Sequence, residues 1–248
     1  MWDPSSSKIF FVQVICWISI PLVIWLGPTW MLLTIAFYIL YSGAGISLTF
    51  HRTISHNSFK FKESIRKALI VLGSLANNGS ALTWASIHRA HHKHCDTIND
   101  PHSPQFKSPW FVIFGSMFAE VDLRHARDLL RDPFVMITHK YYYLIQLPWI
   151  LLLFLLGGWK AVIACHFAPG GLAWLLGGLV NWLNHLYGYQ TYAVKDTSTN
   201  NALTGFLVLG EGWHNNHHAS PIAATTKRSK YEIDIVYYMG RLLGGIPK

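Results

Sequence analysis

Residues 30–56 read WMLLTIAFYILYSGAGISLTFHRTISH, in which an uncharged apolar run is followed by a pair of histidines. The run from Trp30 to Phe50 is about 20 residues long, enough for a helix to cross a hydrocarbon core of about 30 Å. His51 and His56 follow directly after it. This stretch therefore predicts a membrane-spanning helix that places two imidazoles at the membrane surface.

Three more apolar runs extend this pattern along the chain. Gly27-Pro28-Thr29 separates the first run from the second, and Gly157–Lys160 joins the last two. A second span follows the first after a short turn, so we expect the first to be retained rather than cleaved as a signal. We predict an all-α integral membrane protein, a single domain over residues 1–248, with four transmembrane helices in two hairpins. The predicted spans are residues 9–26, 30–50, 143–156 and 161–185.

The polar segments supply the orientation. Five basic residues follow the second run: Arg52, Lys60, Lys62, Arg66 and Lys67. By the positive-inside tendency, residues 51–140 and 186–248 are cytoplasmic and form a helical cap that holds the histidines. The apolar stretch 68–85 is interrupted at Asn77–Ser80, so it predicts either an interfacial helix or a buried one. Pro169-Gly170-Gly171 predicts a break that makes the lower part of the last span a separate short helix.

The composition fits lipid contact. Apolar residues make up 51% of the chain and charged residues 13%, half the level of an ordinary soluble domain. The net charge of +8 suits anionic headgroups, an acidic protein or nucleic acid. We expect no nucleic acid, because the basic residues cluster beside hydrophobic stretches. The three cysteines, Cys16, Cys95 and Cys165, imply no disulfide framework.

Three histidine clusters end hydrophobic segments and indicate a metal site. They read HxxxxH and twice HxxHH, and comprise His51, His56, His88, His91, His92, His214, His217 and His218. In each HxxHH motif, helical spacing puts the three rings on one face. The five-residue gap in the first cluster suits a helix end that opens into a loop. An even number of spans places all three clusters on the same face of the membrane. Histidines scattered over a surface for no common purpose would not gather in this way.

The ligand count favours two metals. Structural zinc needs four ligands, commonly with cysteine, and no cysteine here has ligand spacing. Eight or nine imidazoles divide between two metal ions, and two irons can bind and reduce dioxygen together. Imidazole alone does not choose among zinc, copper, iron and nickel. The carboxylate-rich di-iron pattern is excluded, because the chain has a single ExxH, Glu211 to His214, containing Gly212.

Residues outside the clusters complete the predicted site. His185 lies at the cytoplasmic end of the last span and is expected to be a ninth ligand, with Asn181 binding a metal through water. His166 lies about 28 Å away along a continuous helix and is excluded. Metal-bound imidazoles usually donate their second nitrogen to a carboxylate, and the acids nearest in sequence are Asp96, Asp100 and Glu211.

The order and spacing of these clusters resemble the membrane fatty acid desaturases, specifically the delta-9 group of stearoyl-type and bacterial acyl-lipid enzymes. The resemblance covers nearly the whole chain from about Phe37 onward. Its other motifs are Trp84, Asp100-Pro101-His102, Arg131-Asp132-Pro133, Asn181 with His185–Gly188, Gly210–His214, Asp196–Asn201, Glu232–Ile235 and Arg241–Gly244. Residues 114–121 and 221–226 depart from the family pattern.

The resemblance implies an oxidoreductase that places one cis double bond, at the delta-9 position, in a saturated acyl chain. It implies two iron ions, dioxygen, and two electrons from an external donor. The ligands it implies are the eight cluster histidines and His185, with Asn181 through water, and no catalytic side chains beyond them. Ala168–Gly171 reads APGG and lacks the haem-binding histidine of a fused cytochrome domain. A ferredoxin or cytochrome b5 would therefore dock on the basic cytoplasmic face.

The depth of the substrate can be predicted from the second span. About nine carbons beyond a central double bond extend roughly 11 Å, which reaches Gly43 when measured back from His51. Ile39 or Ile35 would then form the floor of the acyl tunnel, and Trp84 would also contact the substrate. The sequence leaves two substrate carriers open, an acyl-CoA and an acyl-lipid. It also does not distinguish a bacterial inner membrane, a thylakoid and the endoplasmic reticulum as the host membrane.

Two other functions use similar residues. A membrane hydroxylase or alkane monooxygenase would begin with the same hydrogen abstraction, but those families commonly have HxxxH as the first cluster. A histidine-rich metal transporter would place its polar ligands near the middle of the spans. Here the histidines lie at one end of each span, which favours an enzyme.

Overall fold

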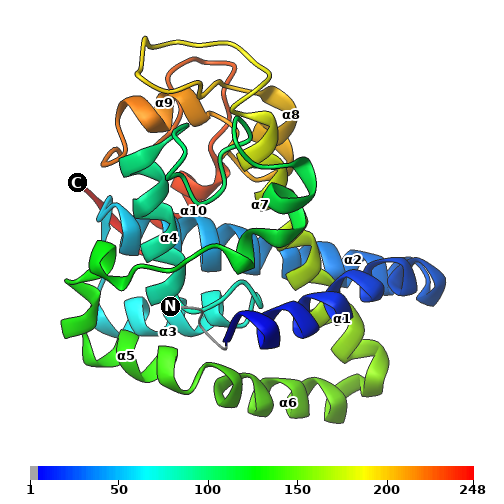
Figure 1. The fold of residues 1–248 in the computed structure, drawn as a ribbon. Coiled ribbons are helices and arrows are strands. Elements are labelled where there is room, and N and C mark those ends of the chain that lie inside the picture. Colours follow the sequence, from blue (N-terminus) through cyan, green and yellow to red (C-terminus); the bar gives the residue numbers. More distant parts are fainter. Residues whose placement is uncertain (1–4) are drawn as a thin grey trace.

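The computed structural model describes residues 5–248, and they form a helical protein with one short pair of strands (Figure 1). The longer helices are α1 (Ser5–Leu26), α2 (Pro28–Tyr38), η1 (Ile39–Ser55), α3 (Glu63–Ser74), α4 (Ala81–His94), α6 (Tyr142–Val162) and α7 (Ala168–Leu183). The shorter ones are η2 (Phe111–Gly115), η3 (Ser116–Phe118), η4 (Leu123–Ala126), η5 (Leu129–Arg131), α5 (Pro133–Lys140), η6 (Ile163–Phe167), α8 (Ala202–Leu207), α9 (His214–Ala219) and α10 (Ile235–Leu242). Strand β1 (Phe59–Lys60) pairs antiparallel with β2 (Ile246–Pro247).

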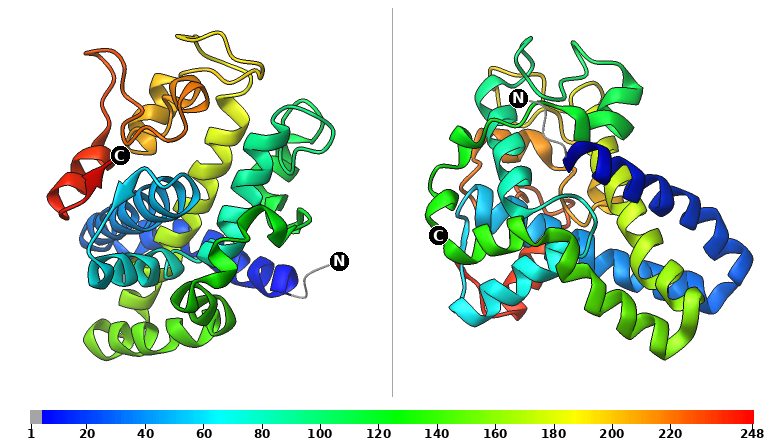
Figure 2. Two further views of the ribbon diagram at one scale, coloured as in Figure 1. Left: turned by 90° about the vertical axis from the view of Figure 1, so that its left-hand side faces the viewer. Right: turned by 60° about the horizontal axis from the view of Figure 1, so that its bottom comes forward.

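Three helices are long and apolar enough to cross a membrane: Lys8–Leu26, Pro28–Ser55 and Tyr142–Leu183. The third contains two non-helical residues, Gly157 and Gly158, the second at φ 62°. Glycine adopts this conformation without steric cost, so the chain turns there as the sequence predicted. The long helices extend together to one side of the molecule (Figure 2, right). Their outer surfaces are apolar: Trp25, Leu32 and Leu156 are 84%, 69% and 75% exposed, as lipid contact requires.

The predicted break at Pro169 is wrong. The chain is helical from Ile163 to Leu183, because the wide turn η6 precedes α7 and Pro169 falls in the first turn of α7. A proline in a first turn lacks only an N–H that would have no helical partner there. The last apolar helix is therefore continuous up to the residues that precede His185.

Helix η1 extends five residues beyond the predicted span and is π-helical. Side-chain hydroxyls follow the same wide spacing, since Thr49, Thr53 and Ser55 donate to the carbonyls five residues earlier at 2.6–2.7 Å. The His56 amide likewise donates to the His51 carbonyl. The loop expected between these two histidines is thus a wide helical turn, which puts residues five apart on the same side. Such turns are frequent at functional sites.

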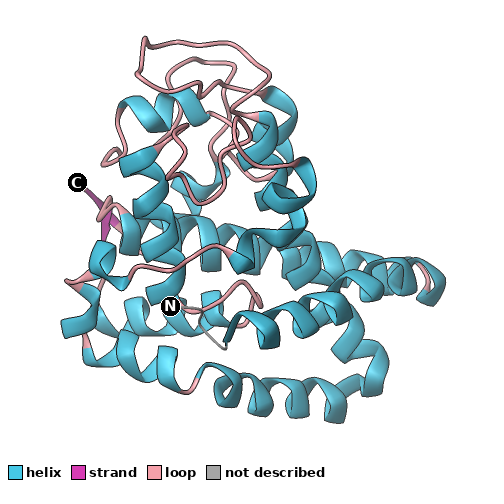
Figure 3. Ribbon diagram, in the orientation of Figure 1, coloured by secondary structure: helices cyan, strands magenta, loops and turns pink. Residues whose placement is uncertain are grey.

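The interrupted stretch 68–85 forms parts of two helices, α3 and α4. One face of α3 packs on η1, where Gly45 and Gly73 approach so closely that a Cβ on Gly45 would lie 2.8 Å from Gly73 Cα. Its other face, which includes Lys67 and Ala68, is exposed, so the helix is buried on one side only. Ser80 ends the interruption and caps α4, accepting a hydrogen bond from the Thr83 amide. Loops gather around α9 at the end of the molecule away from α6 (Figure 3).

Candidate metal centre

Nine histidines from four parts of the chain converge in two groups. The first histidine group comprises His51, His56, His88, His92 and His217, and the second comprises His91, His185, His214 and His218. Within each group the ligand nitrogens lie within 4.8 Å of one another. These are the eight cluster histidines and the ninth, His185, that the sequence suggested.

Each HxxHH helix contributes to both groups rather than presenting three rings to one. On α4, His88 and His92 belong to the first group and His91 to the second. On α9, His214 and His218 belong to the second group and His217 to the first. Residues four apart point in nearly the same direction, whereas adjacent residues differ by about 100°. The two groups therefore lie side by side, and His92 of the first stacks on His218 of the second with ring centroids 4.5 Å apart.

In the first histidine group, imidazole nitrogens face one another. Nε2 of His56 lies 2.7 Å from Nε2 of His88. Nε2 of His217 lies 3.0 Å from Nε2 of both His51 and His92. Trp84 stacks on His88 with ring centroids 4.8 Å apart, which fixes the plane of that ring. In the second histidine group, the Nε2 atoms of His185 and His214 are 3.1 Å apart.

Carboxylates hold the opposite nitrogen of several of these rings. Oε2 of Glu211 lies 2.7 Å from Nδ1 of His51. Oδ2 of Asp100 and Oδ2 of Asp96 each lie 2.9 Å from Nδ1 of a histidine, His91 and His185 respectively. The three acids that the sequence named therefore all contact histidines of the two groups. A carboxylate at Nδ1 keeps the proton there and leaves the Nε2 lone pair free.

Sequence reasoning missed two neighbours of the second histidine group. Oδ2 of Asp196 lies 3.0 Å from Nδ1 of His218, although the two residues are 22 positions apart. The Sγ of Cys95 lies 3.8 Å from His91 Nε2 and from His218 Nδ1, so a cysteine without ligand spacing is nevertheless beside the site. Burial and the nearby carboxylates raise the pKa of this thiol. Only the loop after α7 brings Asp196 into reach, and no spacing rule marks it.

The environment favours the neutral form of several of these imidazoles. Burial, followed by neighbouring imidazoles, lowers the pKa of His88, His214 and His217 well below the ordinary value of 6.5. The pKa of His92 is lowered to about 3 for the same reasons. Neutral imidazole is the form that binds a metal.

The donor set fits metal cations. The Nε2 lone pairs would repel one another without a positive charge between them, and several converge at about hydrogen-bond distance. Among the described residues, the buried Nε2 of His218 has no hydrogen-bond partner. Nitrogen-rich sites of this kind suit first-row transition metals, including iron.

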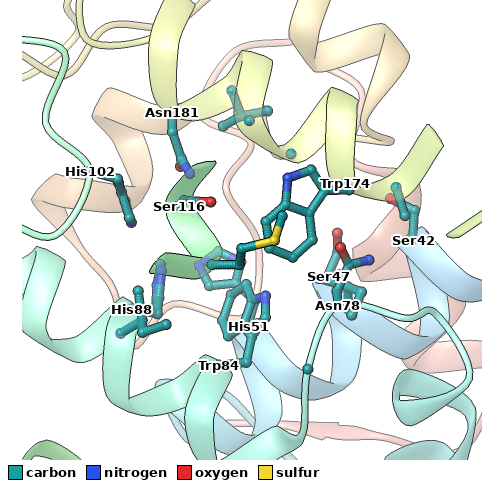
Figure 4. Close-up of a pocket in the computed structure, with 18 of the residues that line it drawn as sticks. Ser42, Ser47, His51, Asn78, Trp84, His88, His102, Ser116, Trp174 and Asn181 are labelled. Carbon is teal, nitrogen blue, oxygen red and sulfur yellow. The ribbon is translucent and has the colours of Figure 1, made fainter. Parts of the chain in front are cut away.

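A cavity of about 180 Å³ adjoins both histidine groups (Figure 4). Its site end is lined by Trp84, His51, His88, His214 and Asn181, and its apolar wall includes Ile46, Ile87, Met117 and Val180. Trp84 therefore lies where a substrate contact was expected. Asn181 shares this cavity with the histidines (Figure 4).

The predicted tunnel floor requires correction. Ile35 and Ile39 are 51% and 37% exposed on the outer surface of their helices. The space beside Gly43 is filled by the side chains of Leu209 and Met239, so it is not available to a ligand. Depth along the helix was estimated from the sequence without the direction of each side chain, and the cavity lies on the face of Ser42, Ile46 and Ser47. His166, excluded by distance, lies instead beside Asn77 at 3.4 Å.

Comparisons with known proteins agree with this geometry. A sequence model of the fatty acid desaturase family matches residues 28–236. The chain is 35% identical over 212 residues to an sn-2 palmitoyl-lipid 9-desaturase of Nostoc sp. (strain 36), covering 82% of this chain and 74% of that protein. It is 36% identical over 211 residues to an sn-1 stearoyl-lipid 9-desaturase of Anabaena variabilis, covering 83% and 77%.

A relative from Anemone leveillei is named for a different substrate. The chain is 34% identical over 218 residues to an acyl-CoA C20 Delta5-desaturase of Anemone leveillei, covering 84% of this chain and 69% of that protein. The family match spans every histidine of both groups. The chain is therefore an oxidoreductase of lipid metabolism and belongs to the fatty acid desaturase family.

Proposed function

We propose that this chain inserts a cis double bond at the delta-9 position of a saturated acyl chain carried by a membrane lipid. The observation that carries the proposal is the division of nine histidines into groups of five and four beside an apolar cavity. Relatives at 35% and 36% identity are named as lipid 9-desaturases, which favours an acyl-lipid over an acyl-CoA substrate. Because the Anemone leveillei relative is named for an acyl-CoA, an acyl-CoA substrate is the alternative to test.

We assign two irons, one to each histidine group, with Asn181 contributing through water to the group of four. Bound iron would supply the one-electron chemistry for reducing dioxygen to two waters, with two hydrogens and their electrons taken from the acyl chain and two electrons and two protons taken from the external donor and solvent. The protein contributes the neutral imidazoles and the carboxylates that orient them. Trp84 and the apolar wall of the cavity position the acyl chain and exclude water. The substitution Ile39→Ala should not alter this positioning, because its side chain points outward.

We further propose four membrane spans, counting the helices on either side of Gly157 and Gly158 separately. The basic residues after Ser55 favour a cytoplasmic location for the histidine groups. Electrons then come from a ferredoxin or a cytochrome b5 at a basic cytoplasmic surface. Electrostatic docking of that kind predicts electron transfer that weakens as ionic strength rises.

Two other functions are alternatives to the desaturase. A hydroxylase or alkane monooxygenase would use the same histidines and release an alcohol. A metal transporter is disfavoured because His51 lies near the end of its apolar helix, Pro28–Ser55, and the other members of the two histidine groups lie outside the three apolar helices.

The experiment is expression in a desaturase-deficient bacterium or yeast, with a matched donor and with lipid classes separated before gas chromatography. We expect a new delta-9 monounsaturated acyl chain in membrane lipids, and none with His214→Ala. A new hydroxylated product would replace the desaturase proposal with the hydroxylase one. No new product from iron-loaded protein with a working donor would defeat both. Unsaturation that appears first in acyl-CoA would overturn the lipid-substrate assignment alone.

A further inference from the structure

The C-terminal segment 227–248 has an apolar surface that the rest of the described chain leaves uncovered. It contains α10, whose residues Val236 and Gly240 are buried against η1. The opposite side of the segment is exposed and apolar: Tyr231 79%, Ile233 62%, Tyr238 57%, Leu242 87% and Ile246 63%. A helix that is apolar on both sides needs a second apolar or interfacial neighbour.

The contacts of α10 place it on the membrane side of the histidines. A Cβ on Gly43 would meet Met239, and a Cβ on Gly240 would meet Leu48. Gly43 and Leu48 precede His51 by eight and three residues on a helix long and apolar enough to span a membrane. At no more than about 1.5 Å per residue, α10 lies up to about 12 Å closer to the bilayer centre than His51. Figure 2 shows the red α10 alongside η1 in both views.

The charges of the segment are arranged for an anionic surface. Its five basic residues are Lys227, Arg228, Lys230, Arg241 and Lys248, and all but Lys227 are exposed. Its two acids, Glu232 and Asp234, are buried at 2% and 1% exposure and bonded inward. The surface therefore presents tyrosines, aliphatic side chains and positive charges together. This combination is typical of helices that lie in the headgroup region of a membrane.

The segment is also tied to the first histidine group. Asp234 caps α10 by accepting a hydrogen bond from the Tyr237 amide. Its Oδ2 lies 2.8 Å from Arg52, which in turn donates to Oε1 of Glu211. Glu211 holds Nδ1 of His51 at 2.7 Å. The position of α10 and the orientation of the His51 ring are therefore linked through three buried side chains.

We propose that segment 227–248 is a membrane-docking surface that binds the anionic lipid interface of the membrane its own long helices cross. This inference rests on the membrane placement proposed above. The tyrosines and Leu242 insert at the headgroup boundary, and the exposed basic residues pair with lipid phosphates. Docking holds α10 against η1 and, through Asp234 and Arg52, keeps Glu211 against His51.

The test places a fluorophore on single introduced cysteines in the full, iron-loaded chain reconstituted in vesicles. The site is Leu242→Cys, at a side chain that is 87% exposed and does not line the cavity. Ala193→Cys, in the exposed loop beyond the end of α7, is the aqueous control, and the outward Leu32→Cys is the embedded control. Labelling of the unsubstituted chain corrects for Cys95, since Cys16 and Cys165 are buried. Brominated lipids and acrylamide report lipid and water contact respectively.

The label at position 242 should be quenched several-fold more by brominated lipid than the label at 193, and correspondingly less by acrylamide. Phosphatidylglycerol in phosphatidylcholine vesicles should increase that lipid quenching, and added salt should reverse the increase. The double variant Lys230→Gln, Arg241→Gln should lose the response to phosphatidylglycerol while retaining lipid contact.

Three results separate failure of this proposal from failure of the membrane placement. Water contact at 242 with lipid contact at 32 overturns docking and leaves the spans intact. Water contact at both sites defeats the membrane placement itself. Protection at 242 that appears only after a donor protein is added assigns the surface to a protein partner and overturns lipid docking.

Discussion

Four carboxylates set the orientation of histidine rings in this protein. Glu211, Asp96, Asp100 and Asp196 each contact an Nδ1 atom at 2.7–3.0 Å. A neutral imidazole with its proton held at Nδ1 presents Nε2 as the ligand atom. The sequence indicated three of the four because they lie close to the clusters, and Asp196 was missed because only a folded loop brings it near His218.

Asp196 offers the cleanest single-residue test. Asp196→Asn keeps the size of the side chain and weakens the hold on the His218 ring, so iron affinity should fall about 10- to 100-fold. The measurement is iron retained per protein during titration with a chelator. Asp122→Asn, at a carboxylate that pairs with Arg124 and His125 outside the two histidine groups, is the matched control and should behave as the parent. Unchanged retention by Asp196→Asn would show that this contact does not orient a ligand.

At the scale of elements, the wide helix η1 and the helix α3 set where the first histidines emerge. Sequence patterning located the apolar run that η1 continues, but periodicity did not reveal its π-helical turns. Those turns depend on hydroxyl-to-carbonyl bonds and on close packing with α3. Two glycines make that packing possible, and a side chain on Gly45 would strike the backbone of Gly73.

Gly45→Val should therefore force η1 and α3 apart. Overpacking of this kind costs about 1–3 kcal/mol, and the thermal unfolding midpoint in detergent should fall accordingly. Iron content should fall with it, because His51 lies on the same helix. Gly177→Ala is the control, since a Cβ there meets nothing within 4 Å. A Gly45→Val variant with the parent's midpoint would contradict the packing argument.

At the scale of the whole molecule, η1, α4, α7 and the histidine groups enclose a shared cavity. Its position could not be read from one helix, because η1, α4, α7, η3 and the loop after α8 all contribute to its wall. The sequence estimate of depth selected Ile35 and Ile39, which lie on the outer surface of α2 and η1, and Gly43, which packs against Leu209 and Met239. The residues that face the cavity decide which acyl chains fit.

Gly177 tests this assignment, because it lines the cavity and leaves open space around its Cα. Gly177→Leu should fill that space and shift the products toward shorter acyl chains, with discrimination against longer chains of about tenfold or more. Gas chromatography of the products measures the shift. Ile39→Ala, on the outer surface, should leave the distribution unchanged. If Ile39→Ala shifted the chain length of the products and Gly177→Leu did not, the acyl chain would end at Ile39 and not in the cavity.

The buried histidines also predict how the metal-free protein responds to acid. Burial lowers the pKa of His88, His91, His92, His214, His217 and His218 below 6.5. Below pH 6.5 the unfolded chain therefore binds more protons than the folded one, and folding stability falls as the pH is lowered. Thermal unfolding of iron-free protein between about pH 8 and pH 5 measures this, with a flat region above about pH 7.5. A midpoint that rises on acidification would contradict it.

The local pattern of this sequence was sufficient to predict the helical class, the apolar runs, the turn at Gly157 and the nine candidate ligands. Each of these follows from neighbouring residues, since hydrophobicity, helical spacing and glycine conformation act over a few positions. The division of the ligands into five and four, the contacts of Asp196 and Cys95, the cavity wall and the link from α10 to His51 were decided by tertiary structure alone. They join residues up to 182 positions apart, and the directions in which those side chains meet are set only when the helices pack.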